Sequence, residues 1–170
     1  MSLTEHYEAV CAERRGADVL SPLGTWEVVS GAEWCFGRAV PGGGIARGDA
    51  LKVGHIRREV REWLGAWRLS SLADDVCVVL SELVTNAIRY GDGYFAVRMS
   101  RLRLGEYSEL HLEVWDGSTD LPCLRDAGLD AESGRGLLLV HGLVSELGGT
   151  YGVGDDGRRT WCRIPAQRAA

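Results

Sequence analysis

The chain lacks long hydrophobic runs and an excess of basic residues. No apolar segment approaches the roughly 20 residues that a helix needs to cross a bilayer, and the N-terminus does not combine a basic segment with an apolar one. We therefore expect a cytoplasmic protein that does not enter a membrane. The formal net charge of −5 argues against attraction to nucleic-acid phosphates, so we expect no direct nucleic-acid contact. The pairs Arg57-Arg58 and Arg158-Arg159 are predicted to be solvated surface.

Cysteine and histidine are sparse and scattered. No Cys-x-x-Cys motif occurs, and no histidine stands at metal-ligand spacing from a cysteine, which argues against a zinc site. The cysteines are expected to be reduced thiols that mostly serve packing: Cys11, Cys35, Cys77, Cys123 and Cys162. The histidines lack a neighbouring serine or cysteine in a nucleophile motif, so we expect structural or surface roles for them: His6, His55, His111 and His141.

Apolar residues are abundant enough for one substantial core. The 170 residues are 45% hydrophobic, which fits a single domain. We divide the chain into an N-terminal extension of unknown role (1–32), a domain (33–165) and a short tail (166–170). Most tryptophans fall at core periods, so we expect them to pack in the interior rather than stack on nucleic-acid bases.

Hydrophobic periodicity predicts a first strand and a first helix. The strand is expected over 33–40, and Pro41 to Gly44 break it. Asp49 is predicted to be the N-cap of a helix that runs from about residue 50 to residue 67. Apolar residues recur at helical spacing along this segment: Val53, Ile56, Val60, Leu64 and Trp67.

A second, stronger helix follows directly. Ser71 to Asp74 has the form of a capping box, and the acidic pair Asp74-Asp75 suits the positive end of the helix dipole. The helix is expected to end near Tyr90, where Gly91-Asp92-Gly93 stops it. One stripe of apolar residues should be buried: Val76, Leu80, Leu83, Val84 and Ala87.

Two antiparallel strands are predicted next, over 95–100 and 110–115, joined at Gly105-Glu106. The apolar phase slips between Met99 and Leu102, which predicts a bulge or a switch of face at that point.

The last part of the chain predicts a loop, a helix and a hairpin. Residues 118–133 show neither helical nor strand periodicity and form a long connection for a compact domain. Loops of this length are usually functional or disordered. A helix from 134 to 147 should end at a Gly-Gly pair, and strands over 150–153 and 158–164 flank the turn Asp156-Gly157. These elements indicate a two-layer α/β (α+β) sandwich with a mixed, mostly antiparallel sheet and helices on one face.

Glu82 and Asn86 form the first candidate for chemistry. They stand four residues apart, so their side chains share one face at the edge of the second helix. A carboxylate there can orient or deprotonate a hydroxyl, while a carboxamide oxygen can bind a magnesium ion that bridges phosphates. Taken alone, the pair reads equally as ordinary polar residues on an exposed helix face.

Asp116 and Gly134-Arg135-Gly136 form two further candidates. Asp116 ends an apolar strand and could accept a hydrogen bond from the amine of adenine, although Asp-Gly-Ser is also a common turn sequence. The glycines open a helix and leave backbone N–H groups accessible to an anion, or they form a flexible junction. The literal G-x-G-x-x-G over 152–157 is a hairpin turn instead, because no helix follows it and its acidic residues would repel a pyrophosphate.

Three segments, taken in order, resemble the N, G1 and G2 boxes of histidine-kinase-like ATPases, which have the Bergerat fold. They are residues 81–87 (SELVTNA), 114–118 (VWDGS) and 133–137 (SGRGL). The loop between the last two lies where that family has its ATP lid. The resemblance covers about 33–165, and the compact form is most similar to the anti-sigma-factor serine/threonine kinases.

The resemblance implies roles for individual residues. Glu82 matches the catalytic acid/base and Asn86 the magnesium ligand, while Asp116 matches the residue that binds adenine. Thr160 matches a threonine that supports this aspartate. The remaining nucleotide-binding candidates border the nucleotide or belong to the glycine boxes: Tyr90, Gly91, Ser118, Gly134, Arg135, Gly136 and Leu137.

Two departures from the family pattern qualify these roles. Ser118 and Asp120 replace both glycines of the family's Asp-x-Gly-x-Gly, and Arg159 replaces the glycine that precedes Thr160. Both bear more on lid closure and phosphoryl transfer than on adenine binding, because Asp116 is present.

The resemblance implies an anti-sigma factor that uses ATP and Mg²⁺. It would bind a sigma factor and phosphorylate an antagonist (anti-anti-sigma) protein, and a homodimer is typical of that family. The alternative is a catalytically inactive, nucleotide-responsive binding module of the same fold. A detached catalytic domain of a histidine kinase is disfavoured, because the chain has no room for dimerisation helices.

Overall fold

The computed structural model describes residues 20–21, 24–25, 27–37, 47–91, 93–116, 135–154 and 157–166. Its main sheet has five strands in the order β3-β4-β5-β7-β6, and each neighbouring pair is antiparallel. The strands are β3 (Glu27–Gly37), β4 (Tyr94–Leu104), β5 (Tyr107–Trp115), β6 (Thr150–Val153) and β7 (Arg159–Pro165). A separate pair is formed by β1 (Leu20–Ser21) and β2 (Gly24–Thr25).

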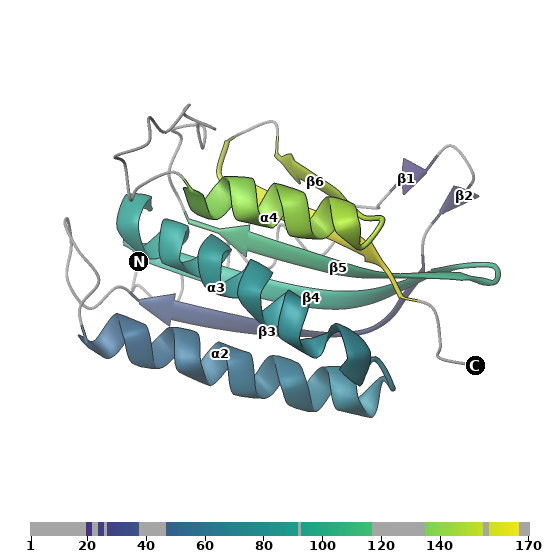
Figure 1. Cartoon of the computed structure of the whole chain (residues 1–170), viewed down its shortest axis with the longest axis horizontal. Helices are drawn as coiled ribbons and strands as arrows, with labels where there is room; N and C mark the ends of the chain where they lie inside the picture. The colour runs from purple at the N-terminus through teal and green to yellow at the C-terminus, as the bar shows by residue number, and fades with distance from the viewer. Residues whose placement is uncertain are drawn as a thin grey trace, which may run out of the picture.

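Three described helices lie on one face of the main sheet (Figure 1). They are α2 (Arg47–Ala66), α3 (Ala73–Tyr90, after the 3₁₀ turn η1 at Ser70–Leu72) and α4 (Arg135–Glu146). The expected two-layer sandwich is therefore confirmed. The sheet is antiparallel throughout its described strands, however, so the mixed pairing that we expected is not seen there.

The core lies between the helices and the sheet. The apolar stripes of α2 and α3 meet the inward residues of β4, β5 and β7, as the periodicity predicted. Several of these side chains are fully buried, among them Val60, Leu80, Met99, Leu112 and Ile164. Full burial of such side chains contributes about 1.5–3 kcal/mol each, so this interface is the main source of stability.

Two predicted helix starts are wrong in detail. Asp49 is not an N-cap: α2 already begins at Arg47, and Asp49 lies buried in its first turn, 2.9 Å from the Lys52 ammonium. A carboxylate is stabilised there by the helix dipole as well as by the lysine. The capping box at Ser71 does not form either, because η1 takes up Ser71 and Leu72 is an N-cap without a side-chain bond.

The first predicted strand begins too late, since β3 already starts at Glu27. Its extra length is held by pairing with the whole of β4. The phase slip between Met99 and Leu102 is a switch of face within β4, whose register with β5 is unbroken. Met99 joins the core, whereas Leu102 is buried outside it, and the irregularity in register lies in β3 between Val28 and Ser30.

Other predictions are confirmed by the backbone. Gly105 and Gly157 have positive φ values of 58° and 71° in the two hairpin turns, and Gly148, with φ 72°, follows the end of α4.

Cys35, Cys77 and Cys162 are free thiols, while Cys11 and Cys123 lie outside the described residues. The predicted loop over 118–133 and the break over Pro41–Gly44 lie outside them too.

The described residues lack two features, a membrane-spanning helix and a metal-binding cluster. Within them, no helix is long and apolar enough to cross a membrane. The same part of the chain contains no group of three or more His, Cys, Asp or Glu side chains arranged to hold a metal ion.

Candidate functional site

The α3 helix brings Glu82 against the start of α4. Glu82 and Asn86 are both half-buried on the edge of α3 that the spacing predicted. A Cβ atom added to Gly136 would collide with Oε2 of Glu82. The contact therefore requires the absence of a side chain at Gly136, and it joins the first and third of the predicted boxes.

Directly after the last residue of α3, Gly91 lies against Asp116. A Cβ on Gly91 would be 2.7 Å from the carbonyl oxygen of Asp116 and 2.9 Å from its Cβ, and it would also strike the carbonyl oxygen of Ala87. The N–H of Gly91 donates to that same Ala87 oxygen at 2.9 Å. Glycine is thus what lets the helix end approach the strand end that carries Asp116.

Thr160 lies on β7 beside the end of β5. Its partner in the register is Val114, and the N–H of Asp116 donates to the carbonyl oxygen of Arg158 at 3.2 Å, which continues the ladder beyond the strand. By the alternation along β5, Asp116 and Val114 share the face that the helices cover. Thr160 therefore belongs to the same side of the sheet as Asp116.

The other predicted residues divide into three groups. Tyr90 is 60% exposed at the end of α3, next to Gly91, while Leu137 is buried in the core cluster. Arg135 begins α4, but its side chain lies outside the described part. Ser118 and Gly134 lie outside the described residues altogether.

These residues fit a site for magnesium and a nucleotide. The carboxamide oxygen of Asn86 is the kind of hard ligand that magnesium prefers, the Glu82 carboxylate can act as an acid/base, and Asp116 offers an acceptor for an exocyclic amine. At the start of α4, the space beside Gly136 is taken by the Glu82 carboxylate, where the helix dipole favours a negative charge.

A comparison with protein families decides which family this is. Residues 47–164, more than half of the chain, match the model of the histidine kinase-like ATPase domain. The chain belongs to this family. No curated protein matches the sequence. Histidine kinase-like ATPase domains bind ATP, generally with Mg²⁺, which agrees with the donor set around Glu82, Asn86 and Asp116.

The ATPase domain also carries an ion-pair network on the sheet face away from its helices, which the sequence reading missed. Glu113, 4% exposed, accepts from Arg159 at 3.0 Å and lies 3.7 Å from Arg98. Arg98 also bonds to Glu33 at 2.8 Å and lies 5.0 Å above the Trp115 ring. Arg159, which we expected to be solvated surface, is only partly exposed because it also pairs with Glu113.

This ion-pair network can be recognised only when the register of the strands is known. Arg98 pairs with both Glu33 and Glu113 across two strand boundaries, so opposite charges stand side by side. The alternation of charged and apolar residues in each strand was visible, but the facing partners were not.

His111 lies buried beside this network. Burial, first, and the guanidinium groups of Arg163, Arg159 and Arg98, second, together lower its pKa from 6.5 to about 3. Glu113 lies 4.0 Å away and would favour the charged ring, but Glu113 is already bonded to Arg159. We therefore assign a neutral imidazole, which fits the structural role expected for this histidine.

Proposed function

We propose that this ATPase domain is an anti-sigma factor with serine/threonine protein kinase activity, which binds a sigma factor and phosphorylates an antagonist protein with Mg-ATP. The observation that carries the proposal is a pair of contacts: Glu82, in the middle of α3, lies against Gly136, and Gly91, directly after the helix, lies against Asp116. One helix thus links an adenine acceptor to a candidate acid/base.

Each residue has a definable task in this proposal. ATP, when bound, supplies the phosphoryl group: its bond to ADP breaks as a bond to the acceptor serine oxygen forms. Asp116 accepts a hydrogen bond from adenine, and Asn86 gives an oxygen to magnesium. Glu82 orients the serine hydroxyl and takes its proton, as a half-buried carboxylate next to a glycine can do.

The first test is calorimetric titration of Mg-ATP into the wild type and into Asp116→Ala. Loss of a charged contact to adenine should weaken binding about tenfold to a hundredfold, which corresponds to roughly 1.5–3 kcal/mol. Asp75→Ala, at the opposite end of α3, is the matched control and should bind as the wild type does. Wild-type protein that does not bind ATP would contradict the proposal.

The second test separates kinase from binding module. Glu82→Gln keeps the shape of the side chain and removes the acid/base, so ATP affinity should persist while phosphate transfer to the antagonist falls about a hundredfold or more. Transfer at the wild-type rate would remove Glu82 from its role.

The alternative, a nucleotide-responsive binding module without catalysis, is favoured by one observation. Ser118 and Asp120 stand where the family's first glycine box has glycines, and both restrict the backbone. If the wild type binds ATP and the antagonist but produces no phosphoserine, this alternative replaces the kinase.

A further inference from the structure

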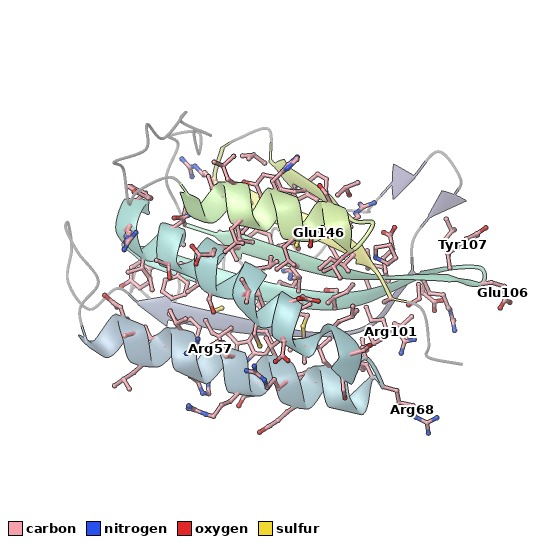
Figure 2. All side chains as sticks on the ribbon, viewed as in Figure 1. Arg57, Arg68, Arg101, Glu106, Tyr107 and Glu146 are labelled. Atoms are coloured by element: carbon pink, nitrogen blue, oxygen red, sulfur yellow. The ribbon has the colours of Figure 1, made fainter. Side chains whose placement is uncertain are left out.

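A groove of about 630 Å³ runs between α2 and α3. From α2 it is lined by Gly54 and three arginines, and from α3 by two carboxylates and three smaller side chains: Arg57, Arg58, Arg61, Asp74, Cys77, Val78, Ser81 and Glu82. Arg57 lies on the side of α2 that faces α3 (Figure 2). Glu82, the candidate acid/base, is thus a wall of this groove as well as a contact of Gly136.

The positive charge of the groove is only partly compensated. Arg61 pairs with Asp74 at 2.9 Å near the turn between the helices. Arg57 and Arg58 are exposed, and neither forms an ion pair within the part of the chain that the structure describes. The groove therefore presents two adjacent guanidinium groups that can pair with an acidic ligand, although the protein as a whole has a net charge of −5.

The position of Arg57 relative to Glu82 is fixed by the packing of the two helices. The Cys77 thiol donates to the backbone carbonyl oxygen of Arg57 at 3.6 Å. Cys77 is itself buried, so this point of contact is anchored in the core. Ser81 lies one helical turn beyond Cys77 and Glu82 follows it, which sets the arginine pair and the carboxylate along the same groove.

We propose that this groove docks an acidic polypeptide segment of the phosphate-accepting protein and so presents its serine to Glu82. The inference rests on the proposed kinase function and names the partner's chemistry. Arg57 and Arg58 supply the complementary charge, and Val78, 41% exposed, supplies an apolar contact. A polypeptide fits better than a nucleic acid, because it can place single carboxylates beside Arg57 and Arg58, whereas the regularly spaced phosphates of a nucleic acid would also face Asp74 and Glu82.

The test measures fluorescence anisotropy of a labelled acidic peptide with a central serine, without nucleotide. A basic peptide of equal length and a single-stranded oligonucleotide serve as the other probes. The wild type should bind the acidic peptide in preference to both, and binding should weaken as salt is added. Arg57→Glu should weaken it about tenfold, with a smaller loss for Arg58→Glu.

Arg68→Glu is the matched control. It makes the same change of charge at an exposed arginine outside the groove (Figure 2) and should bind the peptide as the wild type does. Circular dichroism confirms that each variant is folded. Equal loss in Arg57→Glu and Arg68→Glu, tighter binding of the oligonucleotide, or no preference for the acidic peptide would overturn the proposal.

Failure of docking and failure of the kinase can be told apart. ATP is absent from the peptide measurement, so a chain that binds no ATP could still reveal the docking groove. Conversely, Arg57→Glu should keep wild-type affinity for Mg-ATP in the calorimeter. A loss of ATP affinity in this variant would assign the arginine to the nucleotide instead and overturn the docking role.

Discussion

The two faces of the main sheet are buried by different means. Along β4 and β5, the residues under the helices are apolar, such as Val97 and Leu112, while their neighbours Arg98 and Glu113 point to the other face and form ion pairs. The candidate site lies on the helix-covered side, at the strand end that carries Asp116. The comparison teaches that a buried charge need not be functional: Glu113 is more buried than Glu82, yet its contacts are structural.

The strongest test of this comparison is Gly91→Ala on the helix-covered side. The new methyl group would strike backbone oxygens of Ala87 and Asp116, which cannot move aside as a side-chain tip can. We expect a loss of about 3 kcal/mol in the free energy of unfolding together with weaker ATP binding. Urea denaturation and calorimetry measure the two effects. Gly142→Ala is the control, since a Cβ there meets nothing within 4 Å; an equal loss in both variants would contradict the role of the contact.

Glu113→Gln tests the opposite face. The substitution removes the charge that faces Arg159 and Arg98 and should lower the free energy of unfolding by about 2 kcal/mol, less than for a fully buried pair because both arginines reach solvent. Affinity for Mg-ATP should not change. A weaker affinity, measured on protein still folded, would show that the two faces are not independent.

His111→Gln tests the same face through the pH dependence of the free energy of unfolding. The folded pKa of about 3 lies below the ordinary value of 6.5, so the unfolded chain takes up a proton first as the pH falls. The contribution to stability is complete above pH 6.5 and is lost between pH 6.5 and about 3, by up to about 1.4 kcal/mol per pH unit. Denaturation at several pH values should give a flatter profile for the variant than for the wild type. Identical profiles would contradict a neutral His111.

Gly136→Ala should have the smallest effect on stability, below about 1 kcal/mol, because the methyl group meets only the flexible tip of Glu82. Its effect on function should nevertheless be large. Displacing Glu82 is expected to lower phosphate transfer about a hundredfold. A transfer assay with Gly142→Ala as control measures this, and unchanged transfer in Gly136→Ala would mean that the contact does not position Glu82.

The regular elements and much of the candidate site could be predicted from local signals. The helical stripes of α2 and α3, the two hairpins and the end of α4 follow from apolar spacing and glycine position. Glu82 and Asn86 stand on the predicted helix edge, and Asp116 stands directly after its strand. The start of β3 and the helix caps could not be predicted, because pairing with β4 and the packing of η1 outweigh weak local preferences.

The sequence by itself determined the sandwich of helices on a sheet and the order of the three boxes, since periodicity and glycine position act between near neighbours in the chain. Only the tertiary structure decided which distant residues meet: Glu82 with Gly136, Gly91 with Asp116, Arg98 with Glu33 and Glu113, and Arg57 with Cys77. These contacts depend on strand register and helix packing. Both are set by the burial of the whole core, so a residue's local neighbourhood does not reveal its partner.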